Sequence, residues 1–459
     1  MAGMARGEVE VEEDGLDMRR VEAILAAVAR HDTADLTRLL DLLHAADIAD
    51  LLEQIAPADR NALLQMRPDA IDGEVLSELD DSIREDVIDA LSPERVAEAI
   101  RELESDDIVD ILEDLDAPAQ GKILDALDHD DRRDVEEALA YPEYSAGRLM
   151  QREVVTGPMD WTVGEAIDHL RGVEHLPDQF YHLILIDGAE VPQGYVTLGR
   201  VLSSRRDTRL QNLFEDSFRT IAAEDPEADV AYIFNQYHLI SCPVVDRDGK
   251  LVGVITIDDA MAVLDEEHQE DMLRLAGVSD EASLTDGAFE TMRKRLPWLV
   301  VNLFTASLSA LVITQFEATI VALVALAALM PIVASTGGIA GTQSLAVTVR
   351  ALATRDLTRS NARRVILREL GAGVLNGLSL AVILGLAAWL IFGDPRLGAV
   401  LGIAMIVNQV VAALGGVLVP LTLERLGLDP ALASGTFVTT LTDVMGFFAF
   451  LGLATLFLL

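Results

Sequence analysis

The sequence predicts a multidomain chain: an all-α, acidic, superhelical N-domain, two copies of an α+β unit, a connecting helix, and an α-helical membrane domain with five transmembrane helices. Charge is the first observation behind this prediction, since the 459 residues contain 76 Asp and Glu against 35 Lys and Arg, yet residues 291–459 hold only 7 acidic and 11 basic residues. The second observation is a series of long apolar runs confined to that same C-terminal part. The third is a strand–helix pattern that occurs twice in the middle of the chain.

The N-domain is expected at residues 19–145, after a short acidic segment, 1–18, that we expect to be disordered because it lacks apolar periodicity. Apolar residues recur three or four apart, and a Leu-x-x-Leu pattern followed by paired acids recurs in SELDDSIRED, RELESDDIVDILEDLD and DALDHDDRRD. Prolines mark helix starts at Pro57, Pro93 and Pro118. The pattern predicts short helices packed as hairpins in a superhelical array, which is typical of a binding module.

Residues 146–207 and 208–267 share a second pattern. In the first copy the apolar strand FYHLILID is followed by a turn at 192–194 and the strand YVTLGRVL; in the second, LISCPVVD is followed by a turn at 247–250 and LVGVITIDDAMAVL. A hairpin followed by a helix, repeated in this way, resembles a tandem pair of CBS domains, which are β-α-β-β-α regulatory modules. The resemblance implies an ATP site in the second copy at Thr256 and Asp259, which match the family's Thr-x-x-Asp. In the first copy Arg200 replaces the acidic residue.

A connecting helix is expected at residues 268–296, continuing from an unusually acidic stretch. Carboxylates occur there at a density that an ordinary helix face does not tolerate, because like charges at helical spacing repel: Asp265, Glu266, Glu267, Glu270 and Asp271. We therefore expect a cation to offset them, with a merely solvated acidic helix as the alternative.

Five apolar segments are long enough to cross a bilayer as helices, near 297–316, 318–345, 370–392, 397–424 and 431–458. Basic residues set their orientation, because positive residues remain on the cytoplasmic side. Six arginines lie between the second and third spans, namely Arg350, Arg355, Arg359, Arg363, Arg364 and Arg368. The sequence thus predicts a multi-pass protein of the cell inner (plasma) membrane, with the N-terminus and the repeated units in the cytosol and the C-terminus outside.

Polar residues are few within the spans. Asp443 lies near the middle of the fifth span, where a carboxylate costs about 2.5–3.5 kcal/mol, so we expect it to face a wet cavity, with helix packing as the alternative. Pro331 and the glycines of 337–341 are expected to break or kink the second span, either to expose carbonyl oxygens to an ion or simply to allow packing. The pore-lining candidates are Gly337, Gly338, Gly341, Gln343, Asn408, Thr439 and Thr440.

Several function classes are excluded or disfavoured. The acidic charge disfavours nucleic acid as a partner, since phosphate binding needs clustered Lys and Arg. An enzyme is not expected, because the chain lacks a GxxxxGK[ST] loop, a nucleophile–base pair and a His/Cys cluster, and its one cysteine, Cys242, cannot form an intramolecular disulfide. Divalent cations fit the composition better, since hard cations bind carboxylate oxygens.

From about residue 35 to the end, the chain resembles the MgtE family of magnesium channels. The resemblance rests on the order of the parts and on YPEYSAGRLM, RKRLPWLVVNL, PIVASTGGIAGTQSLAVTVRALATRDL and LGLDPALASGTFVTTLTDVMGFF. It implies a homodimer in the lipid membrane, with a Mg²⁺ pore on the two-fold axis between the second and fifth spans. Asp443 matches the family's central ion-binding Asp and Asp429 an acidic residue at the cytosolic mouth, whereas Ile339 stands where the family usually has Asn.

The resemblance also implies that cytosolic Mg²⁺ closes the channel by binding the acidic N-domain, the CBS pair and the connector. The residues implied are Asp259 and Glu267, then Asp258, Glu266, Glu270 and Asp271, and in the N-domain Asp106, Asp107 and Asp110. Two alternatives stay open: a Mg²⁺ transporter coupled to another ion, and a non-conducting, membrane-anchored CBS scaffold. Similar oxygen ligands would also serve Mn²⁺ or Co²⁺.

Overall fold

The computed structural model describes residues 16–101, 103–113, 115–127, 129–173, 176–177, 180–214, 218–279, 282, 287–431 and 434–459, without the side chains of Asp81, Asp130, Asp131 and Ser434. The chain divides into two compact units, Met1–Asp265 and Glu266–Leu459. Most of the segment expected to be disordered lies outside the described residues. Its last two residues are ordered, however: helix α1 begins at Met18, because the Asp17 carboxylate accepts the Arg20 N–H at 2.7 Å and caps the helix.

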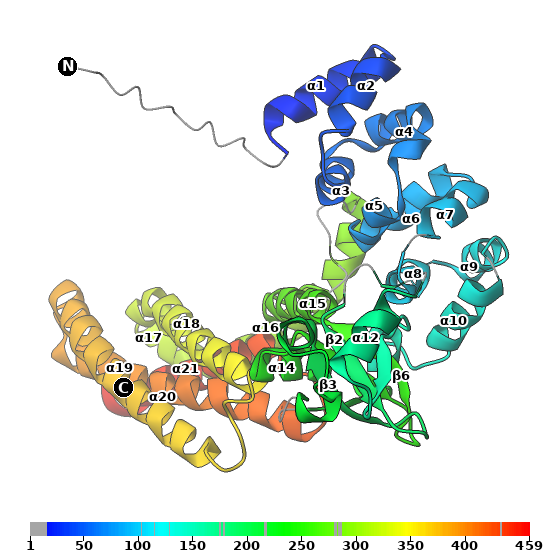
Figure 1. Cartoon of the computed structure of the whole chain (residues 1–459). Helices are drawn as coiled ribbons and strands as arrows, with labels where there is room; N and C mark the ends of the chain where they lie inside the picture. The colour runs from blue at the N-terminus through cyan, green and yellow to red at the C-terminus, as the bar shows by residue number, and fades with distance from the viewer. Residues whose placement is uncertain are drawn as a thin grey trace, which may run out of the picture. The chain divides into compact units, whose positions relative to one another are not determined.

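The N-terminal part of the first unit is an array of short helices (Figure 1). They are α1 Met18–Ala29, α2 Thr33–Leu40, α3 Ala45–Gln54, α4 Pro57–Met66, α5 Gly73–Ser77, α6 Asp81–Ala90, α7 Pro93–Ile100, α8 Ser105–Glu113, α9 Ala117–Leu124 and α10 His129–Leu139, with a 3₁₀ turn at Pro68–Ala70. The array confirms the predicted all-α N-domain, and one continuous apolar core runs through it from Val21 to Ala138.

Local capping explains where these helices start. Pro57 and Pro93 are first helical residues, as predicted, since a first-turn residue needs no N–H partner. The third start is one residue earlier than predicted: α9 begins at Ala117, because Asp116 caps it by accepting the Ala119 N–H at 2.8 Å.

The second part of this unit contains two matching α+β repeats. Their elements are α11 Ala146–Leu149, β1 Thr156–Pro158, α12 Val163–Leu170, β2 His182–Ile186, β3 Pro192–Thr197, α13 Leu198–Ser203, the 3₁₀ turn Leu210–Asn212, β4 Ile221–Ala222, α14 Glu227–Tyr237, β5 Ser241–Val245, β6 Leu251–Thr256 and α15 Ile257–Leu275. Each sheet pairs its first two strands in parallel and its last two antiparallel, with a register shift at the same place in both copies. This agreement confirms the internal repeat and the β-α-β-β-α pattern. One local prediction was wrong, because residues 192–194 lie within β3 and the preceding turn occupies 187–191.

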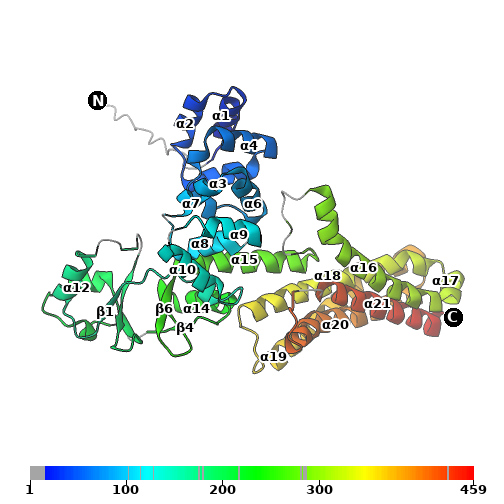
Figure 2. The same ribbon diagram turned by 90° about the vertical axis from the view of Figure 1, so that its right-hand side faces the viewer.

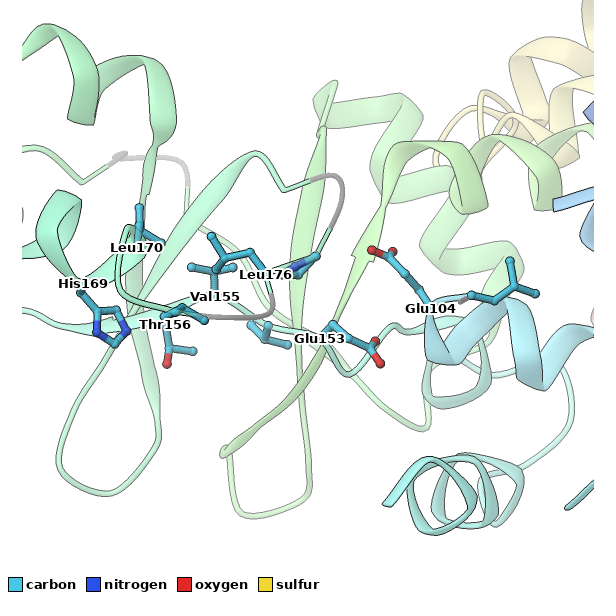
Figure 3. A pocket seen from close by; sticks show the side chains of 11 residues that line it. Glu104, Glu153, Val155, Thr156, His169, Leu170 and Leu176 are labelled. Atoms are coloured by element: carbon cyan, nitrogen blue, oxygen red, sulfur yellow. The ribbon is translucent and has the colours of Figure 1, made fainter. Parts of the chain in front are cut away.

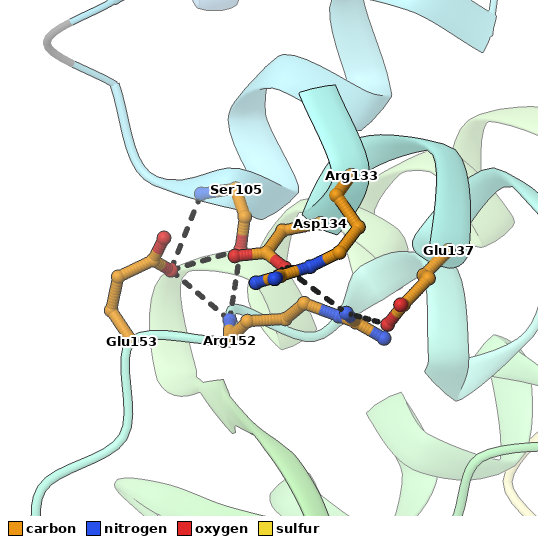
Figure 4. Close-up of polar contacts among 6 residues, drawn as sticks. All are labelled: Ser105, Arg133, Asp134, Glu137, Arg152 and Glu153. Carbon is orange, nitrogen blue, oxygen red and sulfur yellow. Dashed lines mark hydrogen bonds and ion pairs between the residues drawn. The ribbon is translucent and has the colours of Figure 1, made fainter. Parts of the chain in front are cut away.

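A polar network joins the N-domain helices to the first repeat (Figure 4). The Ser105 hydroxyl, at the start of α8, donates to Glu153 at 2.9 Å and accepts the Arg152 N–H at 2.8 Å. The Arg152 guanidinium donates to Glu137 of α10 at 2.6 Å, and its Nη1 lies 3.7 Å from Asp134. The helices α8 and α10 are thereby tied to the segment that precedes β1.

A cavity of about 440 Å³ lies next to this network, between the residues that precede α8 and the first repeat. Figure 3 shows Glu104 and Glu153 at one end of it and His169 and Leu170 at the other. None of the residues that the sequence singled out as site candidates lines it.

The connector differs from the prediction of one helix at 268–296. Helix α15 begins immediately after β6 and ends at Leu275, while residues 288–296 are the start of the next long helix, α16 Ala288–Gln315. The reason is a helix stop at Gly277, whose φ of +71° suits glycine and ends α15.

The second unit contains five helices long and apolar enough to cross a membrane, as predicted. They are α16, α18 Ala325–Ala353, α19 Ala362–Phe392, α20 Pro395–Arg425 and α21 Ser434–Leu458, with the short α17 Glu317–Ala322 before α18. Helix α20 packs against α18, α19 and α21, and α16 packs against α21. These five helices lie together in both Figure 1 and Figure 2.

One prediction for the second span was wrong. The span does not start near 318: α17 ends at Ala322, and Leu323 interrupts the helix with φ of −137° and ψ of 81°, for which the sequence offers no signal. Of the two alternatives at Pro331 and 337–341, a broken backbone is not observed, because α18 is helical throughout, and packing is the one that the structure supports. The glycines serve close packing instead, since a Cβ on Gly341 would lie 2.5 Å from Val438 of α21 and a Cβ on Gly337 would overlap the Asn408 amide of α20.

Candidate cation sites

Asp443 is a half-buried carboxylate in the middle of the apolar helix α21. In the described part of the chain its carboxylate has neither a hydrogen-bond nor an ion-pair partner. The nearby threonine hydroxyls donate to carbonyls of their own helix, Thr439 to Gly435 at 2.9 Å and Thr440 to Thr436 at 2.6 Å. Their oxygen lone pairs therefore remain available as acceptors or ligands. This is an environment in which a carboxylate gains most from a cation or ordered water.

The predicted pore-lining residues separate into two groups. Gly338, Thr439 and Thr440 are half-buried and Gln343 is exposed, so these four lie on an accessible face of the unit.

The other three do not. Asn408 is fully buried and donates its amide N–H to the Val333 carbonyl at 2.8 Å, while Gly337 and Gly341 are buried at helix contacts. Enclosed between helices of one chain, these three residues do not reach its accessible surface, and their assignment to the pore stays a prediction. Glycine and a hydrogen-bonding amide are also common where membrane helices pack tightly, and this accounts for their positions in the structure.

The cytosolic candidates Asp106 and Asp107 begin α8, and Asp258 and Asp259 begin α15. Asp106 is only 8% exposed. The structure brings the two helix starts together, because the carboxylates of Asp106 and Asp107 both interact electrostatically with Asp259. We name Asp106, Asp107, Asp258 and Asp259 the cytosolic acidic cluster.

Burial and mutual repulsion raise the pKa values of three members of this cluster, Asp106, Asp107 and Asp259. Burial is the largest cause of the rise in the pKa of Asp259 to about 7, and Asp258 and Asp107 add to it. Burial, Asp110 and Asp258 raise the pKa of Asp107 to about 6. The pKa of Asp106 is raised by burial and then by Asp259. These carboxylates are therefore poorly stabilised as anions by the protein alone, so a cation that pairs with them would lower the free energy of the assembly.

Three further acids lie close enough to the cluster to raise the pKa of Asp107: Asp110, Glu74 and Glu78. Asp110, a predicted ligand, is engaged elsewhere, since its carboxylate lies 3.2 Å from the buried Arg84 guanidinium. Glu74 and Glu78 of α5 were not predicted, yet both raise the pKa of Asp107 by repulsion. Nothing distinguishes them in the sequence from the other acids of the N-domain, because only the fold brings α5 against α8.

The Thr-x-x-Asp motif forms a helix cap. The Asp259 carboxylate accepts the Thr256 hydroxyl at 2.7 Å and the Thr256 N–H at 3.4 Å, at the start of α15. In the first repeat Thr197 accepts the Arg200 N–H at 3.3 Å, and the Arg200 side chain turns to the Leu213 carbonyl at 3.0 Å. Both repeats thus place a threonine at the start of the helix that follows their last strand, but Thr197 accepts a hydrogen bond where Thr256 donates, and the residue three positions later carries the opposite charge.

A second acidic group lies wholly within the second unit, at the end of α15. Arg274 pairs with Glu270 at 2.8 Å and with Asp429, in the connection before α21, at 2.9 Å. Burial raises the pKa of Glu267 and of Asp271, and neighbouring carboxylates add to both shifts while Arg274 opposes them. Glu266, by contrast, is exposed. The sequence identified the acids but missed Arg274, whose partner is far away along the chain.

The end of α15 also makes apolar contacts in the same unit. Leu275 packs with Leu345 and Val349 of α18 and with Val438 of α21. A hydrophobic contact and the Arg274 ion pair therefore hold this helix end against the helices that carry the candidate pore residues.

No ready-made metal cage is present among the residues that the structure describes, since no three Asp, Glu, His or Cys side chains there are grouped to hold an ion. Mg²⁺ needs none, because it retains several waters and uses one or two carboxylates.

Comparison with known families identifies three matching segments: MgtE, described as a divalent cation transporter, at residues 330–453; the MgtE intracellular N domain at 43–144; and a CBS domain at 213–266. The magnesium transporter MgtE of Thermus thermophilus is 34% identical over 71% of this chain and 73% of its own length, and that of Enterococcus faecalis is 33% identical over 72% of each. A solved cytosolic domain of the Mg²⁺ channel MgtE in complex with ATP is 27% identical, covers 53% of this chain and 99% of that structure, and has a TM-score of 0.49. The chain belongs to the MgtE family of magnesium transporters.

Proposed function

We propose that this chain is a Mg²⁺-selective channel that admits magnesium to the cytoplasm and is closed by cytosolic Mg²⁺. The observation that carries the proposal is Asp443, a half-buried carboxylate that lies inside a membrane-spanning helix and has no protein partner among the residues the structure describes. Membership of a magnesium transporter family supports the choice of ion.

The pore is proposed to form in a homodimer, on the axis where two copies of α21 and α18 meet. Two Asp443 carboxylates on that axis would repel each other unless a divalent cation lay between them. Gly338, Gln343, Thr439 and Thr440 would line the path, because they lie on the accessible face. Asp429 would attract the ion at the cytosolic mouth.

The orientation follows from charge. The arginines between α18 and α19 and the acidic first unit are proposed to lie on the cytosolic side of the inner membrane, with the C-terminus outside. Asp443 would then receive ions that enter from outside the cell.

The cytosolic acidic cluster is proposed to be the sensor, together with Glu266, Glu267, Glu270 and Asp271 of α15. At high cytosolic Mg²⁺ the ion would offset repulsion among these carboxylates and favour a closed state. At low Mg²⁺ the same repulsion would favour the open state, so differential ion binding would shift the equilibrium. The raised pKa values of Asp107 and Asp259 support this role, because they report that the anions lack sufficient counter-charge.

An adenine nucleotide is proposed to bind the second repeat at Thr256 and Asp259. The support is the motif and its geometry, since the hydroxyl and the carboxylate lie together at the start of α15. Because Asp259 also belongs to the acidic cluster, ATP and Mg²⁺ would act on the same helix start. Titration of the full-length protein with ATP, for the wild type and for Thr256→Val, tests this site.

Flux into proteoliposomes tests the main proposal. The wild type, at low internal Mg²⁺, is expected to take up Mg²⁺, and Asp443→Ala is expected to abolish uptake. Raising internal Mg²⁺ should reduce wild-type flux.

A current that depends on voltage and needs no Na⁺ or H⁺ gradient would distinguish a channel from a coupled transporter. Absence of wild-type flux, with Mg²⁺ still bound by the soluble part, would contradict the proposal and favour a regulatory scaffold.

A further inference from the structure

The connection between α18 and α19 carries a dense group of exposed arginines. We name Arg350, Arg355, Arg359, Arg363, Arg364 and Arg368 the basic connection; all six side chains are exposed. Arg350 lies in the last turn of α18, and Arg363 and Arg364 lie in the first turn of α19, so the group is placed where two membrane-spanning helices end.

The backbone that presents these arginines is fixed by its own contacts. The Asn361 amide donates to the Asp356 carbonyl at 2.6 Å, and its oxygen accepts the Thr358 N–H at 2.8 Å. Leu357 is 4% exposed, packs with Val417 and Leu421 of α20, and donates its N–H to the Ala351 carbonyl at 2.7 Å. The Asn361 amide and the backbone groups named above thus have hydrogen-bond partners within the turn, whereas the guanidinium groups are exposed to solvent.

Most of these guanidinium groups have no internal counter-charge. In the part of the chain that the structure describes, Arg350, Arg359, Arg363 and Arg364 form no ion pair, whereas Arg368 pairs with the adjacent Glu369 at 3.1 Å. Elsewhere the acidic chain pairs its arginines readily, as with Arg60, Arg84, Arg148 and Arg152. Four unpaired arginines within 15 residues of a strongly acidic protein therefore indicate an external anion.

We propose that the basic connection binds the headgroups of anionic phospholipids in the adjacent leaflet. The position favours lipid over a soluble ligand, because Arg350 lies in the last turn of one membrane-spanning helix and Arg363 and Arg364 lie in the first turn of the next, and the ends of such helices meet the headgroup region. Arginine suits this role, since its planar fork donates two parallel hydrogen bonds to a phosphate. Basic residues that only set the orientation of the spans need no particular backbone structure, since their charge is sufficient. The hydrogen-bonded turn that presents these arginines is therefore better explained by binding.

The test measures which lipids contact the full-length protein in bilayers. Spin-labelled phosphatidylglycerol and spin-labelled phosphatidylcholine are added separately to phosphatidylcholine bilayers containing the protein, and electron spin resonance gives the fraction of each that is immobilised. Each arginine near an anionic surface contributes roughly a five-fold preference. We expect the wild type to prefer phosphatidylglycerol several-fold, and the triple variant Arg359→Gln, Arg363→Gln, Arg364→Gln to lose most of that preference.

Three controls make the result specific. Arg396→Gln removes an exposed arginine from the first turn of α20, beside the connection between α19 and α20, and should leave the preference unchanged. The triple Lys variant at the same three positions should retain most of it, because it keeps the charge. The wild-type preference should also fall between 10 mM and 1 M salt, since the screening length shortens from about 30 Å to about 3 Å.

Thermal unfolding of each variant in detergent shows whether it is folded. No preference in the wild type, as expected if an acidic part of the protein covered these arginines, would overturn the proposal. So would equal loss in Arg396→Gln and in the triple variant, or displacement of the labelled lipid by millimolar inorganic phosphate.

Discussion

The cytosolic acidic cluster and the membrane helices around Asp443 handle carboxylates in opposite ways. In the cluster, Asp106, Asp107 and Asp259 are crowded together, and burial and mutual repulsion raise their pKa values. In the membrane domain, Asp443 has no described protein partner, and glycine contacts between helices hold its surroundings together. Under the proposed function, a cation bound at the first group would offset the repulsion among its carboxylates, and the single carboxylate of Asp443 would bind an ion that crosses the membrane. The proposed sensor and the proposed pore would thus use the same side chain in different ways.

Arg274 lies between these extremes. Its guanidinium pairs with Glu270 and Asp429, so this acidic group already contains a tethered cation. The comparison therefore has three cases. The acids of the cytosolic cluster repel one another, the acids around Arg274 are paired with a guanidinium, and Asp443 is a single carboxylate.

The largest expected effect is on packing in the membrane domain. Gly337→Ala should destabilise the domain by about 1–3 kcal/mol, because the new Cβ would overlap the Asn408 amide. Thermal unfolding in detergent measures the loss. The matched control is Gly371→Ala in α19, where a Cβ would meet nothing within 4 Å. Equal stability of the two variants would show that glycine packing does not maintain the surroundings of Asp443.

Neutralising the cluster should remove its response to Mg²⁺. In Asp106→Asn, Asp259→Asn the amides no longer repel, so α8 and the start of α15 should stay associated without the ion. We expect the Mg²⁺-dependent change in hydrogen exchange of these segments to fall about ten-fold. The exposed pair Asp41→Asn, Asp59→Asn is the control. A full Mg²⁺ response in the cluster variant would show that other residues sense the ion.

Removing the charge of Arg274 should have a smaller effect on hydrogen exchange. Arg274→Gln should raise hydrogen exchange at the end of α15 and around Asp429 about five-fold in Mg²⁺-free buffer, because a partly exposed ion pair contributes about 1 kcal/mol. Arg274→Lys, which keeps the charge, should retain most of the protection. If Arg274→Gln exchanges like the wild type, the Leu275 contacts alone hold this helix end.

The smallest expected effect is a pH dependence of the metal-free cluster. Because the folded-state pKa values of Asp107 and Asp259, about 6 and about 7, lie above those of unfolded aspartate, the association is stabilised at low pH and loses stability as pH rises through 6 to 7. Hydrogen exchange of α8, corrected for its intrinsic pH dependence, should rise from pH 5 to pH 8. Saturating Mg²⁺ should abolish the trend; a trend of the opposite sign would contradict the assignment of these groups.

Much of the architecture was predictable because its signals are local. Apolar runs located the spans, and Pro57 and Pro93 located helix starts. The errors arose where long-range contacts decide the outcome. Gly337 and Gly341 suggested a broken helix, but the bulk of Asn408 and Val438 on neighbouring helices explains why glycine is needed.

The candidate sites show the same limit. The sequence identified Asp259 through its motif and Asp443 through its apolar surroundings. It did not identify Glu74 or Arg274, because Glu74 lies near Asp107, and Arg274 near Asp429, only after folding. It also could not show that Asn408 is buried, because burial between helices cannot be deduced from one helix alone.

Asp443→Asn, followed by two readouts on the same protein, tests most directly whether pore and sensor are separate. Mg²⁺ flux into proteoliposomes should fall about 100-fold or more, because the variant lacks the charge that binds the ion. Mg²⁺-dependent hydrogen exchange of α8 and the start of α15 should match the wild type. Undiminished flux would contradict the assignment of Asp443 as the ion's site in the membrane, and loss of the Mg²⁺ response in the cytosolic cluster would contradict the separation of the two roles.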